Sequence, residues 1–98
     1  MASSNSVTVI IPTLNRPQLV KKCLDSVRQQ TLQPAEIVIV DQSDNEDTKK
    51  LFESMDFPGV RKIHAQQKVK SLILARNRGL DEAGDTSYIC FLDDDIQI

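Results

Sequence analysis

The chain has 98 residues, of which 40% are hydrophobic and 4% aromatic, and its formal net charge is −2. This length and composition are typical of one globular domain with a modest core. The negative charge argues against a broad basic surface for nucleic acids, and the scarcity of aromatic side chains argues against stacking platforms for single strands.

The N-terminal sequence and the cysteines indicate the compartment. Residues 1–6, MASSNS, lack the basic and apolar regions of a secretory signal, and no apolar run is long enough to span a bilayer. We expect residues 1–6 to be a disordered lead-in and the protein to be cytoplasmic, with the cytoplasmic face of the membrane as the location of a longer form. Cys23 and Cys90 lack metal-binding or redox spacing, so we expect both to be reduced core residues.

Apolar runs rich in β-branched residues alternate along the chain with segments of helical periodicity. The runs predict strands over residues 7–11, 36–40, 60–64 and 87–92. The third run has the alternating charges of a sheet edge, whereas the fourth has no polar alternation and predicts a strand covered on both faces. The other patterns predict helices that begin at Pro17, near residues 44–48 and at Ser71. Over residues 71–83, the side chains expected to point inward are Leu72, Ala75, Leu80 and Ala83.

This alternation of strands and helices predicts a fold and a place for a site. It favours a three-layer α/β sandwich with a mainly parallel, Rossmann-like sheet and helices on both faces. In such sheets ligands bind at the carboxyl ends of the strands. Three polar clusters follow the first, second and fourth strands, namely residues 12–16, 41–44 and 93–95. The topology therefore predicts that the three clusters meet at one edge of the sheet.

The third cluster consists of three adjacent carboxylates, Asp93, Asp94 and Asp95. Like charges at this spacing repel one another unless water screens them or a cation neutralises them. Carboxylate oxygens suit Mg²⁺ or Mn²⁺, and Mg²⁺ takes one or two of them together with the oxygens of a substrate phosphate. A solvated acidic turn is the alternative interpretation.

Four ordered blocks, VTVIIPTLNR, EIVIVDQS, LARNRGLDEA and YICFLDDD, resemble the nucleotide-binding half of a family 2 glycosyltransferase with the GT-A fold. The resemblance implies that residues 7–98 form the nucleotide-diphospho-sugar-binding portion of a glycosyltransferase domain, truncated after the strand that carries the DxD motif. It also implies a UDP-, GDP- or dTDP-linked sugar, Mn²⁺ or Mg²⁺ as cofactor, and a glycan or lipid acceptor in cell-envelope polysaccharide biosynthesis.

The same resemblance assigns roles to residues. The loop after the first strand and the acid after the second hold the base and ribose, and an arginine of the third helix approaches the nucleotide. In the DxD motif, Asp93 lies near the ribose and Asp95 binds the metal. The implied nucleotide-binding residues are Pro12, Thr13, Asn15, Arg16, Asp41, Arg76, Asp93 and Asp94, and the implied metal ligand is Asp95.

Two departures from the family pattern modify these expectations. Family members often carry a second Asp where this chain has Gln42, so base and ribose contacts are expected to differ there. The sequence after the DxD motif is too short for an acceptor region and a general base. We therefore expect a fragment of a longer enzyme, with its general base beyond Ile98, that transfers no sugar by itself. We also expect its uncovered edge strand to self-associate.

Several residues and the function as a whole have alternative interpretations. Arg76 and Arg78 can instead pair with Asp81 or Glu82 on a helix surface, and His64 is interpreted as structural. The stronger alternative function is a non-catalytic nucleotide-sugar-binding or interaction module. A phosphoryl-transfer receiver or phosphatase domain fits less well, because the acid after the second strand lacks a partnering acidic pair and a later lysine.

Overall fold

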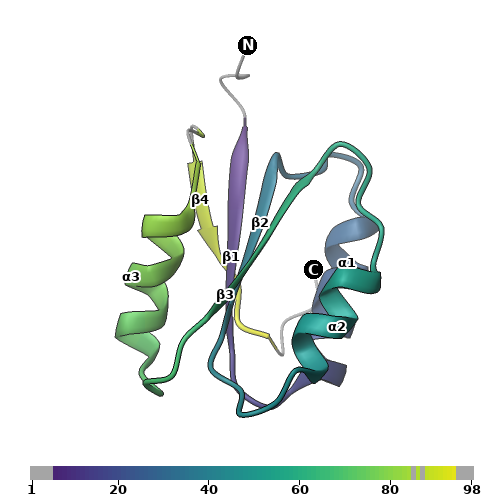
Figure 1. Cartoon of the computed structure of the whole chain (residues 1–98). Coiled ribbons are helices and arrows are strands. Elements are labelled where there is room, and N and C mark those ends of the chain that lie inside the picture. The colour runs from purple at the N-terminus through teal and green to yellow at the C-terminus, as the bar shows by residue number, and fades with distance from the viewer. Residues whose placement is uncertain (1–5, 85, 87, 95–98) are drawn as a thin grey trace.

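The computed structural model describes residues 6–84, 86 and 88–94 (Figure 1). Its four strands form one sheet, which is covered by α3 on one face and by α1 and α2 on the other (Figure 1). The predicted three-layer α/β sandwich is therefore confirmed. The elements are β1 (Val7–Thr13), α1 (Pro17–Arg28), β2 (Glu36–Asp41), α2 (Asp47–Ser54), β3 (Arg61–Gln66), α3 (Leu72–Glu82) and β4 (Tyr88–Phe91).

The sheet has the order β3-β2-β1-β4, and every described pair of neighbouring strands is parallel. At its carboxyl edge Thr13 pairs with Asp41, and Asp41 pairs with Gln66. Since β1 continues through Pro12 to Thr13, it is longer than the predicted strand. The ends of the central strands thus lie side by side, as the topology predicted.

Alternate residues of the strands supply two separate core layers. One layer joins the sheet to α1 and α2, and in α1 it uses the predicted helical stripe of Val20, Cys23, Leu24 and Val27. The other layer joins the sheet to α3 and contains Ile10, Val38, Val40 and Ala75. Pro17 occupies the first turn of α1, where its missing N–H costs no hydrogen bond.

The prediction for the inner face of α3 is wrong at two positions. Leu72 and Leu80 are 51% and 46% exposed, whereas Ala75 and Gly79 are buried. The reason is the close approach of α3 to β1: a Cβ added to Gly79 would lie 2.3 Å from Cγ2 of Ile10. Only small residues fit at such a contact, so the leucines lie to the sides.

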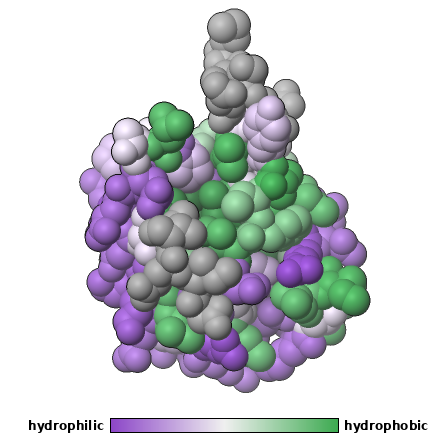
Figure 2. Space-filling view, turned by 180° about the vertical axis from the view of Figure 1, so that it is seen from behind, coloured by the Kyte–Doolittle hydropathy of each residue, from purple (hydrophilic) through white to green (hydrophobic). Residues whose placement is uncertain are grey.

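The prediction that the fourth strand is covered on both faces is also wrong. Among the described residues β4 pairs only with β1, and its Tyr88 is 59% exposed. Cys90 is exposed too, which contradicts its prediction as a core residue, whereas Cys23 is buried as predicted. Seen from behind, the molecule shows hydrophobic residues gathered on this face (Figure 2). The exposed hydrophobic surface of the molecule therefore includes β4, an apolar strand at the edge of the sheet.

We expect the 98-residue chain to self-associate through the edge of β4 as its concentration rises, because an exposed apolar edge strand is a template for pairing. Ile89→Lys, which places a charge on the edge, should return the chain to a monomer without unfolding it. Sedimentation velocity over a wide concentration range measures both. A wild-type chain that stays monomeric at every concentration would contradict the expectation.

The amino edge of the sheet is held by a buried acid, Glu36, whose side chain is 3% exposed. Its carboxylate accepts hydrogen bonds from Thr8 Oγ1 at 3.0 Å and from the Gly84 N–H at 2.7 Å. Arg61 Nη1 lies 3.3 Å from the same carboxylate. Glu36 therefore ties the segment after α3 to β1 and to the start of β3.

Candidate ligand site at the carboxyl edge of the sheet

The first and third polar clusters are in direct contact at the carboxyl edge. Thr13 Oγ1 donates to Asp94 Oδ2 at 2.9 Å, and Arg16 Nη1 lies 3.4 Å from Asp94 Oδ1. Asp94 is almost fully buried, and each of its two carboxylate oxygens contacts one of these neighbours. Asp94 thus joins the acidic turn after β4 to the loop between β1 and α1.

A pocket of about 360 Å³ lies beside this contact. It is lined by Pro12, Thr13, Leu14, Arg16, Gln42, Leu72, Asp93 and Asp94. The exposed Arg16 can bind an anionic group, and the exposed Asp93 can accept hydrogen bonds from hydroxyls. Of the predicted site residues, the structure brings Pro12, Thr13, Arg16, Asp93 and Asp94 together here.

The second polar cluster holds the β1–α1 loop. The Asn15 N–H donates to Ser43 Oγ at 2.7 Å, and the Asp44 N–H donates to Asn15 Oδ1 at 3.3 Å. Asn15 has φ 54°, a left-handed conformation that asparagine tolerates better than most residues. These bonds set the direction in which the chain leaves Asn15 for Arg16.

Asp41, predicted to contact base and ribose, is fully buried in the structure. It accepts hydrogen bonds from the Ser43 N–H at 2.9 Å and lies 2.9 Å from His64 Nε2. Burial raises the pKa of the Asp41 carboxyl, but the hydrogen bonds with His64 and Ser43 outweigh this effect and the pKa lies below its ordinary value. The nucleotide contact of Asp41 stays a prediction, since another side chain lines the pocket at this strand end.

That side chain is Gln42, which sequence reasoning noted only as a departure. Its Oε1 accepts a hydrogen bond from the Ser71 N–H at 2.7 Å, and Ser71 in turn caps the first turn of α3. Strand geometry was the available signal: successive side chains point to opposite faces, so Asp41 and Gln42 cannot both face one pocket. Gln42 therefore anchors the start of α3 beside the candidate site.

Neither Arg76 nor Arg78 lines this pocket. The guanidinium of Arg76 lies 5.6 Å from the centroid of the Phe91 ring, which is within the range of a cation–π contact. Arg78 Nε donates to Glu82 at 3.1 Å, which confirms the surface pairing considered for it. Asp95, the predicted metal ligand, lies outside the described residues.

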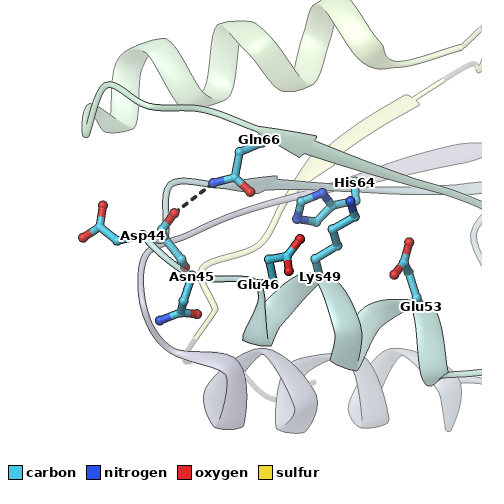
Figure 3. Close-up of a pocket in the computed structure, with 8 residues that line it drawn as sticks. Asp44, Asn45, Glu46, Lys49, Glu53, His64 and Gln66 are labelled. Carbon is cyan, nitrogen blue, oxygen red and sulfur yellow. Dashed lines mark hydrogen bonds between the residues drawn. The ribbon is translucent and has the colours of Figure 1, made fainter.

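A second, larger pocket of about 610 Å³ lies between α2 and β3. Figure 3 shows His64 and Gln66 of β3 facing Glu46, Lys49 and Glu53 from the start and body of α2. The dashed line is the hydrogen bond that Gln66 Nε2 donates to the Ser43 carbonyl at 2.9 Å. Since His64 also contacts Asp41, one residue that lines this pocket is in contact with the buried acid.

The described residues contain neither a cluster of metal ligands nor a membrane-spanning helix. Within them, no three His, Cys, Asp or Glu side chains are grouped closely enough to hold a metal ion. No helix in the same part of the chain is long and apolar enough to cross a membrane.

The fold and the site define a class. This is a parallel α/β domain whose polar loops meet at the carboxyl edge of the sheet, the place where such folds bind their ligands.

The family model for glycosyl transferase family 2 matches residues 8–98. The chain belongs to this family, as the sequence blocks indicated.

Two relatives agree with this assignment. "Glycosyltransferase GlyA" of Streptococcus pneumoniae is 30% identical over 97% of this chain and 14% of its own length. The "GalNAc(5)-diNAcBac-PP-undecaprenol beta-1,3-glucosyltransferase" of Campylobacter jejuni is 30% identical over 94% of this chain and 30% of its own length. The chain therefore spans less than a third of either relative.

The fold itself matches that of S. aureus TarS. The structure of TarS residues 1–349 superposes with a TM-score of 0.77 at 22% sequence identity, covering 94% of this chain and 28% of that one. A TarS 1–349 structure in complex with UDP-GlcNAc superposes with a TM-score of 0.72 at 23% identity, covering 92% of this chain and 26% of that one. The predicted GT-A type of fold is thus confirmed.

Proposed function

We propose that this chain binds the nucleoside diphosphate of a sugar donor in the pocket between the β1–α1 loop and the turn after β4. The observation that carries the proposal is the contact of two loops, from opposite ends of the sequence, around that pocket: Thr13 and Arg16 both bind Asp94. Family membership supports sugar transfer as the reaction. The bound donor would pass its sugar to an acceptor hydroxyl.

Each residue of the pocket has a role that follows from its chemistry. Arg16, held by Asp94, would bind a phosphate oxygen, because a guanidinium donates two hydrogen bonds to such a group. Asp93 would accept hydrogen bonds from ribose hydroxyls. Pro12 would supply a rigid wall for the base, with Gln42 beside it.

We propose that a divalent cation binds beside the carboxylates that follow β4. Asp94 is occupied by Thr13 and Arg16, so the candidates to hold the ion are the exposed Asp93 and, by resemblance, Asp95. One or two carboxylates are enough for Mg²⁺ or Mn²⁺, since the diphosphate supplies further oxygens. When bound, the ion offsets the negative charge that develops on the departing diphosphate.

We further propose a UDP-linked sugar and an acceptor in cell-envelope polysaccharide synthesis at the cytoplasmic side of the membrane. The UDP-linked sugar is supported by the TarS complex with UDP-GlcNAc. A lipid-linked acceptor is supported by the undecaprenol in the name of the Campylobacter relative, whereas the cytoplasmic side rests on the sequence-based expectation alone. GDP- and dTDP-linked sugars are the alternatives that binding measurements can separate.

The experiment is calorimetric titration of the chain with UDP, GDP and dTDP, in Mn²⁺ and in EDTA. We expect UDP to bind about ten-fold or more tightly in Mn²⁺ than in EDTA, a difference of about 1.4 kcal/mol. Asp93→Asn and Asp95→Ala should each remove most of this difference, because each takes away a charged oxygen ligand.

Asp81→Ala is the matched control, since Asp81 is an exposed acid of α3 far along the helix from the pocket. Equal affinity for UDP in Mn²⁺ and in EDTA would contradict the proposal that nucleotide binding depends on a metal ion. Absence of binding by all three nucleotides would contradict the site. Donor binding by a longer enzyme that never releases nucleotide from a nucleotide sugar would favour the non-catalytic module.

A further inference from the structure

Four residues form a hydrogen-bonded relay from the larger pocket to the β1–α1 loop: His64, Asp41, Ser43 and Asn15. His64 Nε2 lies 2.9 Å from Asp41 Oδ2, and Asp41 Oδ1 accepts from the Ser43 N–H at 2.9 Å. Ser43 Oγ accepts from the Asn15 N–H at 2.7 Å. The relay thus crosses from β3 through the end of β2 to the loop after β1.

The chemistry of Asp41 sets the direction of the first bond. The pKa of its carboxyl lies below the ordinary value, so at neutral pH the group is ionised and can only accept hydrogen bonds. His64 Nε2 must therefore carry a hydrogen and donate a hydrogen bond to Asp41. Because Asp41 is fully buried, loss of this donor would leave a desolvated carboxylate with one fewer partner, which is costly unless the group moves.

A displacement of Asp41 would change the position of residues at the first pocket. Ser43 is bonded to Asp41 through its N–H and to Asn15 through its hydroxyl, so displacing Asp41 displaces the acceptor of Asn15. Asn15 is held in a left-handed conformation that is uncommon for residues other than glycine. The next residue in the chain is Arg16, which lines the pocket, so a change at Asn15 would also change the position of Arg16.

We propose that His64 is a positioning residue: through Asp41 and Ser43 it holds Asn15, and hence Arg16, in the shape that binds the nucleotide diphosphate. This extends the sequence interpretation of His64 as merely structural. The side chain is 11% exposed and lines the larger pocket. The consequence for nucleotide affinity rests on the proposed function, whereas the effect on Asn15 does not.

The test uses His64→Phe, which keeps a ring but has no N–H donor, and His64→Gln, which keeps a donor. In the absence of nucleotide, the amide proton of Asn15 is followed by NMR, because losing its acceptor moves its resonance upfield. In His64→Phe we expect this shift, together with an affinity for UDP and Mn²⁺ that is about five-fold lower, the effect of one hydrogen bond. His64→Gln should restore both values toward wild type.

A second perturbation and a control keep the test decisive. Ser43→Ala removes the acceptor of Asn15 directly, so it should reproduce both effects even if His64→Phe fails to fold. The double variant His64→Phe with Ser43→Ala should be no weaker in binding than Ser43→Ala alone, since both break one relay. Glu53→Gln, in the larger pocket but outside the relay, should change neither readout.

The outcomes separate the two proposals. An Asn15 amide that is unchanged in both His64→Phe and Ser43→Ala would overturn the relay. An Asn15 amide that shifts while UDP affinity stays at the wild-type value would overturn the link from the relay to binding. A wild-type chain that binds none of UDP, GDP and dTDP, yet shows the predicted amide shifts in its variants, would overturn the proposed function and support the relay.

Discussion

Glu36→Ala is expected to lower the free energy of unfolding by about 2–3 kcal/mol, because it takes the acceptor from two donors inside the protein and each such loss costs about 1–3 kcal/mol. The substitution leaves the Gly84 N–H without its acceptor and takes one partner from the buried Thr8 hydroxyl. The ion pair with Arg61 adds little to this loss, because Arg61 is 68% exposed and keeps its hydration when the acid is removed. Urea denaturation followed by circular dichroism measures the change.

Two further variants decide whether the carboxylate itself is responsible. Glu36→Gln keeps a side-chain oxygen as acceptor for Gly84 and Thr8, so the loss should fall to about 1 kcal/mol. Glu53→Ala, an exposed acid of α2, should leave the stability unchanged. If Glu36→Ala unfolded at the same urea concentration as wild type, the segment after α3 would not depend on Glu36.

Gly79→Ala should also destabilise the protein, by about 1–3 kcal/mol, the usual effect of overpacking a core. In an ordinary helix interior the same change stabilises by about 1 kcal/mol, because alanine is the better helix former. The sign is reversed here because the new Cβ would lie 2.3 Å from Cγ2 of Ile10. Ile10 is fully buried on a central strand, so it has little room to yield. The thermal midpoint measures the effect.

A double-mutant cycle tests this explanation for Gly79. Ile10→Ala removes the methyl group that the new Cβ would meet, so Gly79→Ala should cost much less in that background than in wild type. Asn77→Ala, at an exposed position of the same helix, should be neutral or slightly stabilising. A Gly79→Ala protein that is more stable than wild type would show that α3 can withdraw from β1 at no cost.

The sequence by itself determined the order of the elements and the place of the site. β-branched runs such as residues 36–40 form strands that are buried on both faces, and the apolar stripe in α1 forms a helix that is buried on one face, because each pattern matches the side-chain period of its element. Once strands and helices alternate, parallel pairing follows, and the polar clusters after β1 and β4 meet. Their contact could therefore be predicted without knowledge of side-chain packing.

Only the tertiary structure decided which side chains face the site and which surfaces are covered. A run such as YICFL looks the same at a sheet edge as at its centre, because local sequence does not report how many strands flank it. In α3 the approach to Ile10 excluded the leucines, a contact between residues remote in sequence. Asp41 turned inward to His64 rather than toward the pocket. The orientation of Asp41 depends on His64 of the neighbouring strand β3, and no local sequence pattern connects these two residues.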